Sequence, residues 1–128
     1  MYRILVVEDN PVNSKMVSQW LTRKGYEVGT VENGELAVQC TYHHSPDLVL
    51  MDMSLPVMDG WTATQTLRKY ERTSKVPIIA LTAHAMQSDQ ERAIECGCDA
   101  FVAKPIDFKK LKSTMDELLE GKATSLPA

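Results

Sequence analysis

Residues 4–10 read Ile-Leu-Val-Val-Glu-Asp-Asn: four apolar residues, then two acidic residues and an asparagine. A short, unbroken apolar run bounded by polar residues is typical of a strand that is buried on both faces. Asn10 is a favoured helix N-cap and Pro11 a favoured first-turn residue, so a helix should begin directly after the acidic pair. The stretch therefore predicts a buried strand that delivers two carboxylates to the start of a helix.

Four further apolar runs repeat this pattern along the chain. With the first, they give expected strands at 4–7, 28–31, 48–51, 78–81 and 101–103. Helical periodicity fills the segments between them, and strand-helix alternation repeated five times predicts a parallel sheet with helices on both faces. We expect an α/β, doubly wound fold in which five strands, in the common order 2-1-3-4-5, are flanked by five helices. The run 28–31 is the least apolar and suits an edge.

Local signals set the expected bounds of the helices. Asn33 should cap the second helix, and the third is expected at about 61–70. Residues 88–91, Ser-Asp-Gln-Glu, form a capping box for a fourth helix that should stop at Gly97. The last helix should begin near Asp107. Its predicted apolar stripe consists of Phe108, Leu111, Met115 and Leu118.

Composition limits the class of protein. The 128 residues are 44% hydrophobic and 24% charged, which is ordinary for a soluble globular protein and excludes disorder of the whole chain. The length suits one domain, which we expect over residues 1–120, followed by a flexible tail over 121–128. No apolar run is long enough for a membrane span, and no secretory signal pattern is present.

Charge and cysteine content limit the kind of partner and the cellular compartment that we expect. A formal net charge of -3 and an isoelectric point near 5.6 argue against nucleic acid as the main partner, because phosphate-backbone binding needs a basic face. Cys40, Cys96 and Cys98 are odd in number and lack the spacing of a disulfide framework. These features predict reduced thiols in a cytoplasmic protein.

Polar residues end four of the five expected strands. Glu8 and Asp9 follow the first, and the other strand-end residues are Asp52, Thr82 and Lys104. Because the carboxyl ends of parallel strands share one edge of the sheet, we expect these side chains to converge on one pocket. Two carboxylates about 5 Å apart repel by roughly 3 kcal/mol at an effective dielectric of 20. The excess of negative charge predicts a divalent ion, and hard oxygen ligands favour Mg²⁺ or Mn²⁺.

This set of side chains fits phosphoryl transfer to an aspartate. An ionised carboxylate can attack phosphorus without a general base, while a metal ion, an ammonium group and a hydroxyl neutralise or bind the peripheral oxygens. The sequence contains neither a P-loop nor a dinucleotide fingerprint, so a nucleotide is not the expected donor.

The chain resembles the receiver domains of two-component response regulators, which have a flavodoxin-like fold. The matching stretches are 4–10, Pro-Asp-Leu-Val-Leu-Met-Asp at 46–52, Leu-Pro-Val-Met-Asp-Gly at 55–60, Ile-Ile-Ala-Leu-Thr-Ala at 78–83 and Lys-Pro at 104–105. The resemblance covers residues 2 to 120 and rests on five motifs in the right order and spacing.

The resemblance implies a role for each strand-end residue. Asp52 would be the phosphoacceptor, with Lys104 paired to the phosphoryl group and Thr82 hydrogen-bonded to it. Asp9, Asp52 and the backbone carbonyl of Ser54 would ligate Mg²⁺, and Glu8 would act through water.

The resemblance also implies switching and modulating positions. Phe101, where the family more often has tyrosine, would follow Thr82 inward on phosphorylation. Ser54, Ala83 and His84 would modulate access to the phosphoryl group or its lifetime. Pro105 would follow a cis peptide bond.

The implied function is that of a single-domain phosphoacceptor. Its phosphodonor would be a histidine kinase or a histidine phosphotransfer protein. It would signal to a protein target through its fourth helix, fifth strand and fifth helix, and would catalyse only its own phosphorylation and dephosphorylation. A receiver excised from a hybrid histidine kinase remains a close alternative. The sequence also leaves a Mg²⁺-dependent aspartyl-phosphate phosphatase and a docking module without phosphorylation as rival classes.

Overall fold

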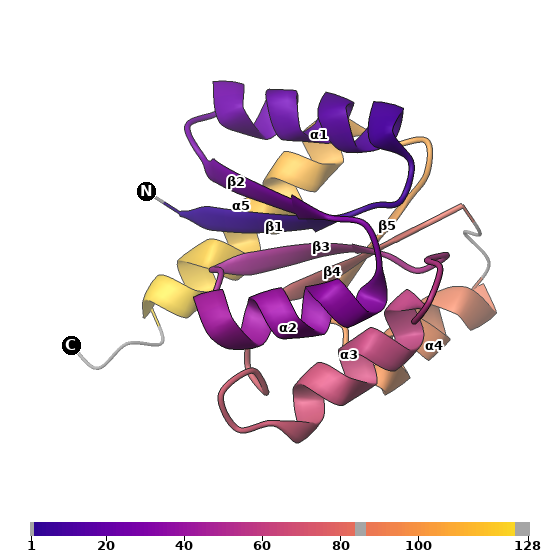
Figure 1. Ribbon diagram of the computed structural model, residues 1–128. Helices are drawn as coiled ribbons and strands as arrows, with labels where there is room; N and C mark the ends of the chain where they lie inside the picture. Colours follow the sequence, from indigo (N-terminus) through magenta and orange to yellow (C-terminus); the bar gives the residue numbers. More distant parts are fainter. Residues whose placement is uncertain (1, 84–86, 125–128) are drawn as a thin grey trace.

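Five parallel strands form the centre of the computed structural model, which describes residues 2–83 and 87–124 (Figure 1). The strands are β1 (Arg3–Val7), β2 (Glu27–Val31), β3 (Leu48–Asp52), β4 (Ile78–Thr82) and β5 (Ala100–Ala103), in the order β2-β1-β3-β4-β5. The helices are α1 (Pro11–Arg23), α2 (Gly34–His44), α3 (Gly60–Lys69), α4 (Gln87–Cys96) and α5 (Phe108–Thr124). The predicted fold class and strand order are confirmed, and β2 is an edge strand.

The helices cover both faces of the sheet, with α1 and α5 on one side and α2, α3 and α4 on the other (Figure 1). Alternate side chains of β1 point to opposite faces of the sheet. Ile4 and Val6 pack towards α1 and α5, whereas Leu5 and Val7 pack towards α2 and α3. All residues of β3 and β4 are buried, which explains why their sequences are continuous apolar runs rather than alternating ones.

Each of the first three helices begins after a residue whose side chain caps its N-terminus. Asn10 Oδ1 accepts from the backbone amides of Val12 and Asn13, at 2.9 and 3.2 Å. Asn33 and Asp59 cap α2 and α3 in the same way. The cap at Asn10 fixes the direction in which the chain leaves β1, directly after the two acidic residues.

The capping box predicted for the fourth helix is wrong. The described part of helix α4 spans Gln87–Cys96, so Ser88 lies within the helix and cannot be the residue that precedes it. The predicted stop is confirmed: α4 ends at Cys96, and Gly97 follows with φ +111°, a conformation that favours glycine.

Helix α5 buries a slightly different stripe from the predicted one. Leu111, Met115 and Leu119 are fully buried, while Phe108 and Leu118 are partly buried against the same core. The helix continues to Thr124, into the segment expected to be a tail, and residues 125–128 lie outside the described part of the chain.

Candidate functional site

The pairing of β1 with β3 brings the acidic residues together. The two strands end in register at Val7 and Met51, so Glu8 and Asp9 leave β1 beside Asp52 at the end of β3. Each of the three carboxylates has an oxygen within 4.8 Å of an oxygen of the others. Glu8 and Asp52 are buried, whereas Asp9 is exposed at the mouth of the site. The expected convergence of these three side chains is therefore observed.

Lys104 supplies the positive charge of this cluster. Its Nζ lies 3.0 Å from Asp52 Oδ2 and 3.3 Å from Glu8 Oε1. The Lys104 backbone amide donates to the Thr82 carbonyl at 2.7 Å, which fixes the point where the chain leaves β5. The peptide bond between Lys104 and Pro105 is cis, as expected for this position.

The two buried carboxyls differ in acidity. Burial, together with the neighbouring Asp52, raises the pKa of Glu8 to about 7. Burial also acts on Asp52, but its interactions with the neighbouring Glu8, with the Ser54 amide and with Lys104 outweigh the effect of burial and hold the Asp52 pKa below its ordinary value. The pKa of Lys104 is raised, because its bonds to both carboxylates outweigh the effect of burial. Asp52 is therefore the ionised carboxylate of the buried pair.

The donor set fits a hard divalent cation. Glu8 Oε2 is buried without a hydrogen-bond partner among the described residues, and such an atom is costly unless an ion or water satisfies it. Asp9 and Asp52 add carboxylate oxygens within the same 4.8 Å group. No histidine or cysteine belongs to this group, so the chemistry suits Mg²⁺ or Mn²⁺ better than zinc.

Ser54 and Gly60 shape the loop that follows β3. The Ser54 amide donates to Asp52 Oδ1 at 3.0 Å and so orients the carboxylate. A side chain at Gly60 would place its Cβ 2.5 Å from the Asp52 carbonyl oxygen. Sequence reasoning assigned no role to Gly60. The Asp-Gly pair at 59–60 was a signal for a turn, but not for this close approach to the end of β3.

The other predicted positions that the structure describes differ in their burial. Thr82 is buried at the end of β4, and Ala83 next to it is exposed. Phe101 is partly buried in the core on the side of α2, α3 and α4. His84 lies outside the described residues.

An apolar hollow of about 410 Å³ adjoins the cluster on the side of α1. Met16 and Val17 line it from α1, Ile106 lines it from the opposite wall, and Glu8 and Lys104 lie on its polar side. Sequence reasoning did not predict this hollow, because its walls come from segments that meet only in the folded chain.

The fold and the site define a class: a doubly wound protein with an acidic, lysine-paired cluster at the carboxyl ends of its strands. The family model of response regulator receiver domains matches residues 4–116. The chain belongs to this family, and its members are phosphoacceptors of two-component signalling.

Known proteins of two kinds are similar to the chain. The polar-differentiation response regulator DivK of Brucella anthropi is 36% identical over 116 residues, which are 91% of this chain and 94% of DivK. The receiver domain of a sensor histidine kinase from Pseudomonas aeruginosa, solved with a magnesium ion in its active site cleft, is 39% identical. Its TM-score is 0.87, and the alignment covers 93% of this chain and 98% of that one.

A third similar protein is the receiver domain of a histidine kinase from Syntrophus aciditrophicus, 34% identical with a TM-score of 0.87. The alignment covers 94% of this chain and 92% of that one. The similar proteins thus include both a response regulator and receiver domains of kinases. Within residues 2–83 and 87–124, none of the helices combines the length and apolar character that a bilayer crossing requires.

Proposed function

We propose that Asp52 accepts a phosphoryl group from a phosphohistidine of a histidine kinase or a histidine phosphotransfer protein. One observation carries the proposal: the ionised Asp52 carboxylate lies 3.0 Å from Lys104 Nζ, inside a group of three carboxylates. The membership of the chain in the receiver family supports the same assignment.

The reaction needs no general base. A carboxylate oxygen of Asp52 attacks phosphorus, a P–O bond forms as the P–N bond breaks, and the imidazole nitrogen leaves with the bonding electron pair. Lys104 lies where its ammonium group can pair with an oxygen of the transferred group. Thr82, at the end of the neighbouring strand, is the proposed hydroxyl donor to another oxygen.

Asp9, Asp52 and the backbone carbonyl of Ser54 would hold Mg²⁺, and Glu8 would contribute through a water molecule. When bound, the metal supplies positive charge beside the oxygens of the transferring group. The magnesium ion in the active site cleft of the similar Pseudomonas receiver supports a metal ion at this site, as does the unpartnered Glu8 Oε2.

Phosphorylation would be read through Thr82 and Phe101. The proposed movement of the Thr82 hydroxyl towards the phosphoryl group leaves space that the partly buried Phe101 ring can enter. Because Phe101 lacks a hydroxyl, its change of position acts by packing alone. Ser54, Ala83 and His84 would set access to the phosphoryl group and its lifetime.

The output would be protein binding by the α4–β5–α5 face in the cytoplasm. Both proposed forms of the protein, a single-domain regulator and a receiver of a hybrid kinase, share this chemistry. The similar proteins include both types.

Intact-mass spectrometry after incubation with acetyl phosphate and Mg²⁺ tests the proposal. We expect one added phosphoryl group on the wild type and on Asp116→Asn, a matched aspartate substitution on α5, and none on Asp52→Asn. Equal labelling of wild type and Asp52→Asn would overturn the assignment. Steady release of phosphate from varied phosphomonoesters would instead favour the phosphatase.

A further inference from the structure

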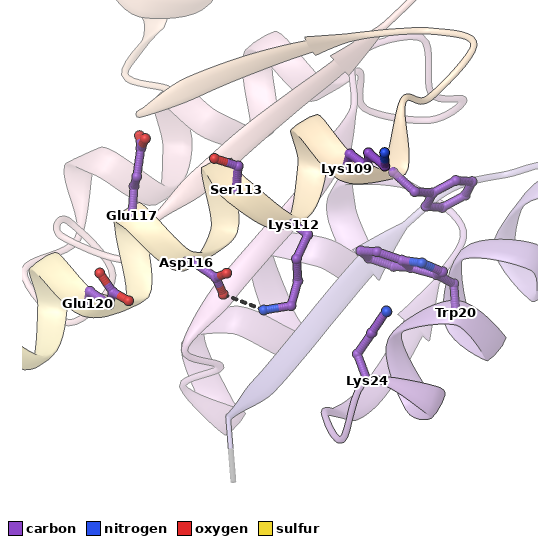
Figure 2. A pocket seen from close by; sticks show the side chains of 9 residues that line it. Trp20, Lys24, Lys109, Lys112, Ser113, Asp116, Glu117 and Glu120 are labelled. Atoms are coloured by element: carbon purple, nitrogen blue, oxygen red, sulfur yellow. Dashed lines mark hydrogen bonds and ion pairs between the residues drawn. The ribbon is translucent and has the colours of Figure 1, made fainter.

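A hollow of about 490 Å³ lies between α1 and α5 (Figure 2). These two helices are on the side of the sheet away from α2, α3 and α4 (Figure 1). Trp20 and Lys24 of α1 form one wall. The other wall is the exposed side of α5, and the rings of Trp20 and Phe108 join the two walls with centroids 4.9 Å apart. The proposed phosphoryl-transfer site uses none of these residues.

The charges of the hollow are separated along α5. Figure 2 shows lysines at one end and acidic side chains at the other. The basic end consists of Lys24, Lys109 and Lys112, and the acidic end of Asp116, Glu117 and Glu120. Lys112 Nζ binds Asp116 Oδ1 at 2.6 Å, whereas Lys109 and Glu120 form no ion pair within the described part of the chain. The outer charges are therefore available to a partner.

Four of the α5 residues form one stripe. Lys109, Ser113, Asp116 and Glu120 follow one another at intervals of four, three and four residues, so they share a helix face that spans about three turns. The order along the stripe is base, small polar residue, acid, acid. In an antiparallel copy of the stripe this order is reversed, so the basic end of one copy faces the acidic end of the other. The stripe is therefore complementary in charge to an antiparallel copy of itself.

We propose that this face docks a second copy of the chain, with the two α5 helices antiparallel about a two-fold axis. An axis level with the point between Thr114 and Met115 brings Lys109 of each copy opposite Glu120 of the other. It also brings Ser113 of each copy opposite Asp116 of the other. A two-fold interface of this kind uses the same patch on both copies and forms each pair twice.

The small Ser113 side chain near the axis permits close approach of the two helices. The acidic end of one copy then lies over the basic end of the other, which includes Lys24 on α1. Because exposed ion pairs contribute little individually and are screened by salt, the dimer should be weak and salt-sensitive.

Sedimentation velocity on the full chain, without a phosphodonor, tests the pairing independently of the proposed function. We expect the wild type to show reversible dimerisation as its concentration rises towards about 1 mM at low salt. Lys109→Glu or Glu120→Lys alone places like charges opposite each other, and each should weaken association at least about tenfold. Both residues are exposed, so folding should be unaffected. Lys69→Glu, an exposed lysine at the end of α3, is the matched control and should dimerise like the wild type.

Mixing the two variants gives the sharpest test. In a heterodimer of Lys109→Glu with Glu120→Lys, both crossed pairs regain opposite charges, so the mixture should dimerise although neither variant does alone. Failure of the mixture to associate would overturn the proposal. So would undiminished association of either single variant, or a wild type that stays monomeric throughout the concentration range.

Discussion

Lys104 joins the buried acids of the cluster into one unit. Its ammonium group contacts both Asp52 and Glu8, and removal of one partner from a buried charge group leaves the remaining charges uncompensated. The same contacts hold Asp52 in its ionised form, the form that a nucleophile requires.

We predict that Lys104→Gln slows phosphorylation by acetyl phosphate by about 10²- to 10³-fold, the usual effect of removing one electrostatic contact to a developing charge. Time courses by intact-mass spectrometry measure the rate. Lys69→Gln should react like the wild type. An unchanged rate in a folded Lys104→Gln protein would show that the ammonium group takes no part.

At the site, Gly60 has the least room for an added side chain. Gly60→Ala places a methyl group against the Asp52 carbonyl and the Met53 Cα, and overpacking of this kind costs about 1–3 kcal/mol. We expect thermal unfolding to show that loss, together with slower phosphorylation as the end of β3 shifts. Gly29→Ala on the edge strand is the control, because the new methyl group meets only Leu5 Cδ1 at 3.9 Å. Equal stability of the two variants would contradict the close approach at Gly60.

At the scale of elements, Arg68 ties the end of α3 to the chain segments around β4. Its guanidinium donates to the carbonyls of Thr73, Ser74, Val76 and Gly97 and to the Asp99 carboxylate, at 2.7 to 3.3 Å. Asp99 Oδ2 also accepts from the Ile78 amide at 2.8 Å, where β4 begins. One side chain therefore positions the strand that carries Thr82.

Arg68→Ala should lower the free energy of unfolding by about 2–4 kcal/mol, because four part-buried carbonyls lose their donor at once. Urea denaturation followed by circular dichroism measures the change. Lys69→Ala, the exposed neighbour, should stay within about 0.5 kcal/mol of the wild type. A similarly small change for Arg68→Ala would mean that water replaces the guanidinium without cost.

The sequence was most informative where a single local rule decides the outcome. The expected strands agree with the observed ones to within one residue at each end. For β1, β3 and β4 the reason is that a buried parallel strand needs a continuous apolar run. The convergence of Glu8, Asp9 and Asp52 also followed from topology. Arg68 escaped prediction because its five partners meet it only in the folded chain. The raised pKa of Glu8 depends on its burial, which a charge count does not contain.

At the scale of the whole molecule, Cys98 reports on the integrity of the core. Its thiol lies 3.8 Å from the Thr64 hydroxyl, and burial raises its pKa to about 12. An unfolded cysteine ionises near pH 8.5. Between these values the folded chain holds one more proton than the unfolded chain, so stability falls as pH rises above about 9.

We predict that the protected Cys98 thiol lowers the free energy of unfolding by as much as about 1.4 kcal/mol for each pH unit above about pH 9. Urea denaturation from neutral to alkaline pH measures it. Cys98→Ala starts from a lower stability but has no thiol to ionise at this position. Its free energy of unfolding, plotted against pH, should therefore run parallel to that of the wild type below about pH 9 and fall less steeply above it. Parallel curves over the whole range would contradict a protected thiol.

The central claim is that one particular carboxylate carries phosphorus. Borohydride reduction of the acetyl-phosphate-treated protein converts an acyl phosphate to homoserine, and tandem mass spectrometry of the peptides then locates it. We predict homoserine at residue 52 alone, and none when Mg²⁺ is removed by chelation before the reaction. Homoserine at residue 9, 47 or 59 with an unmodified Asp52 would contradict the account.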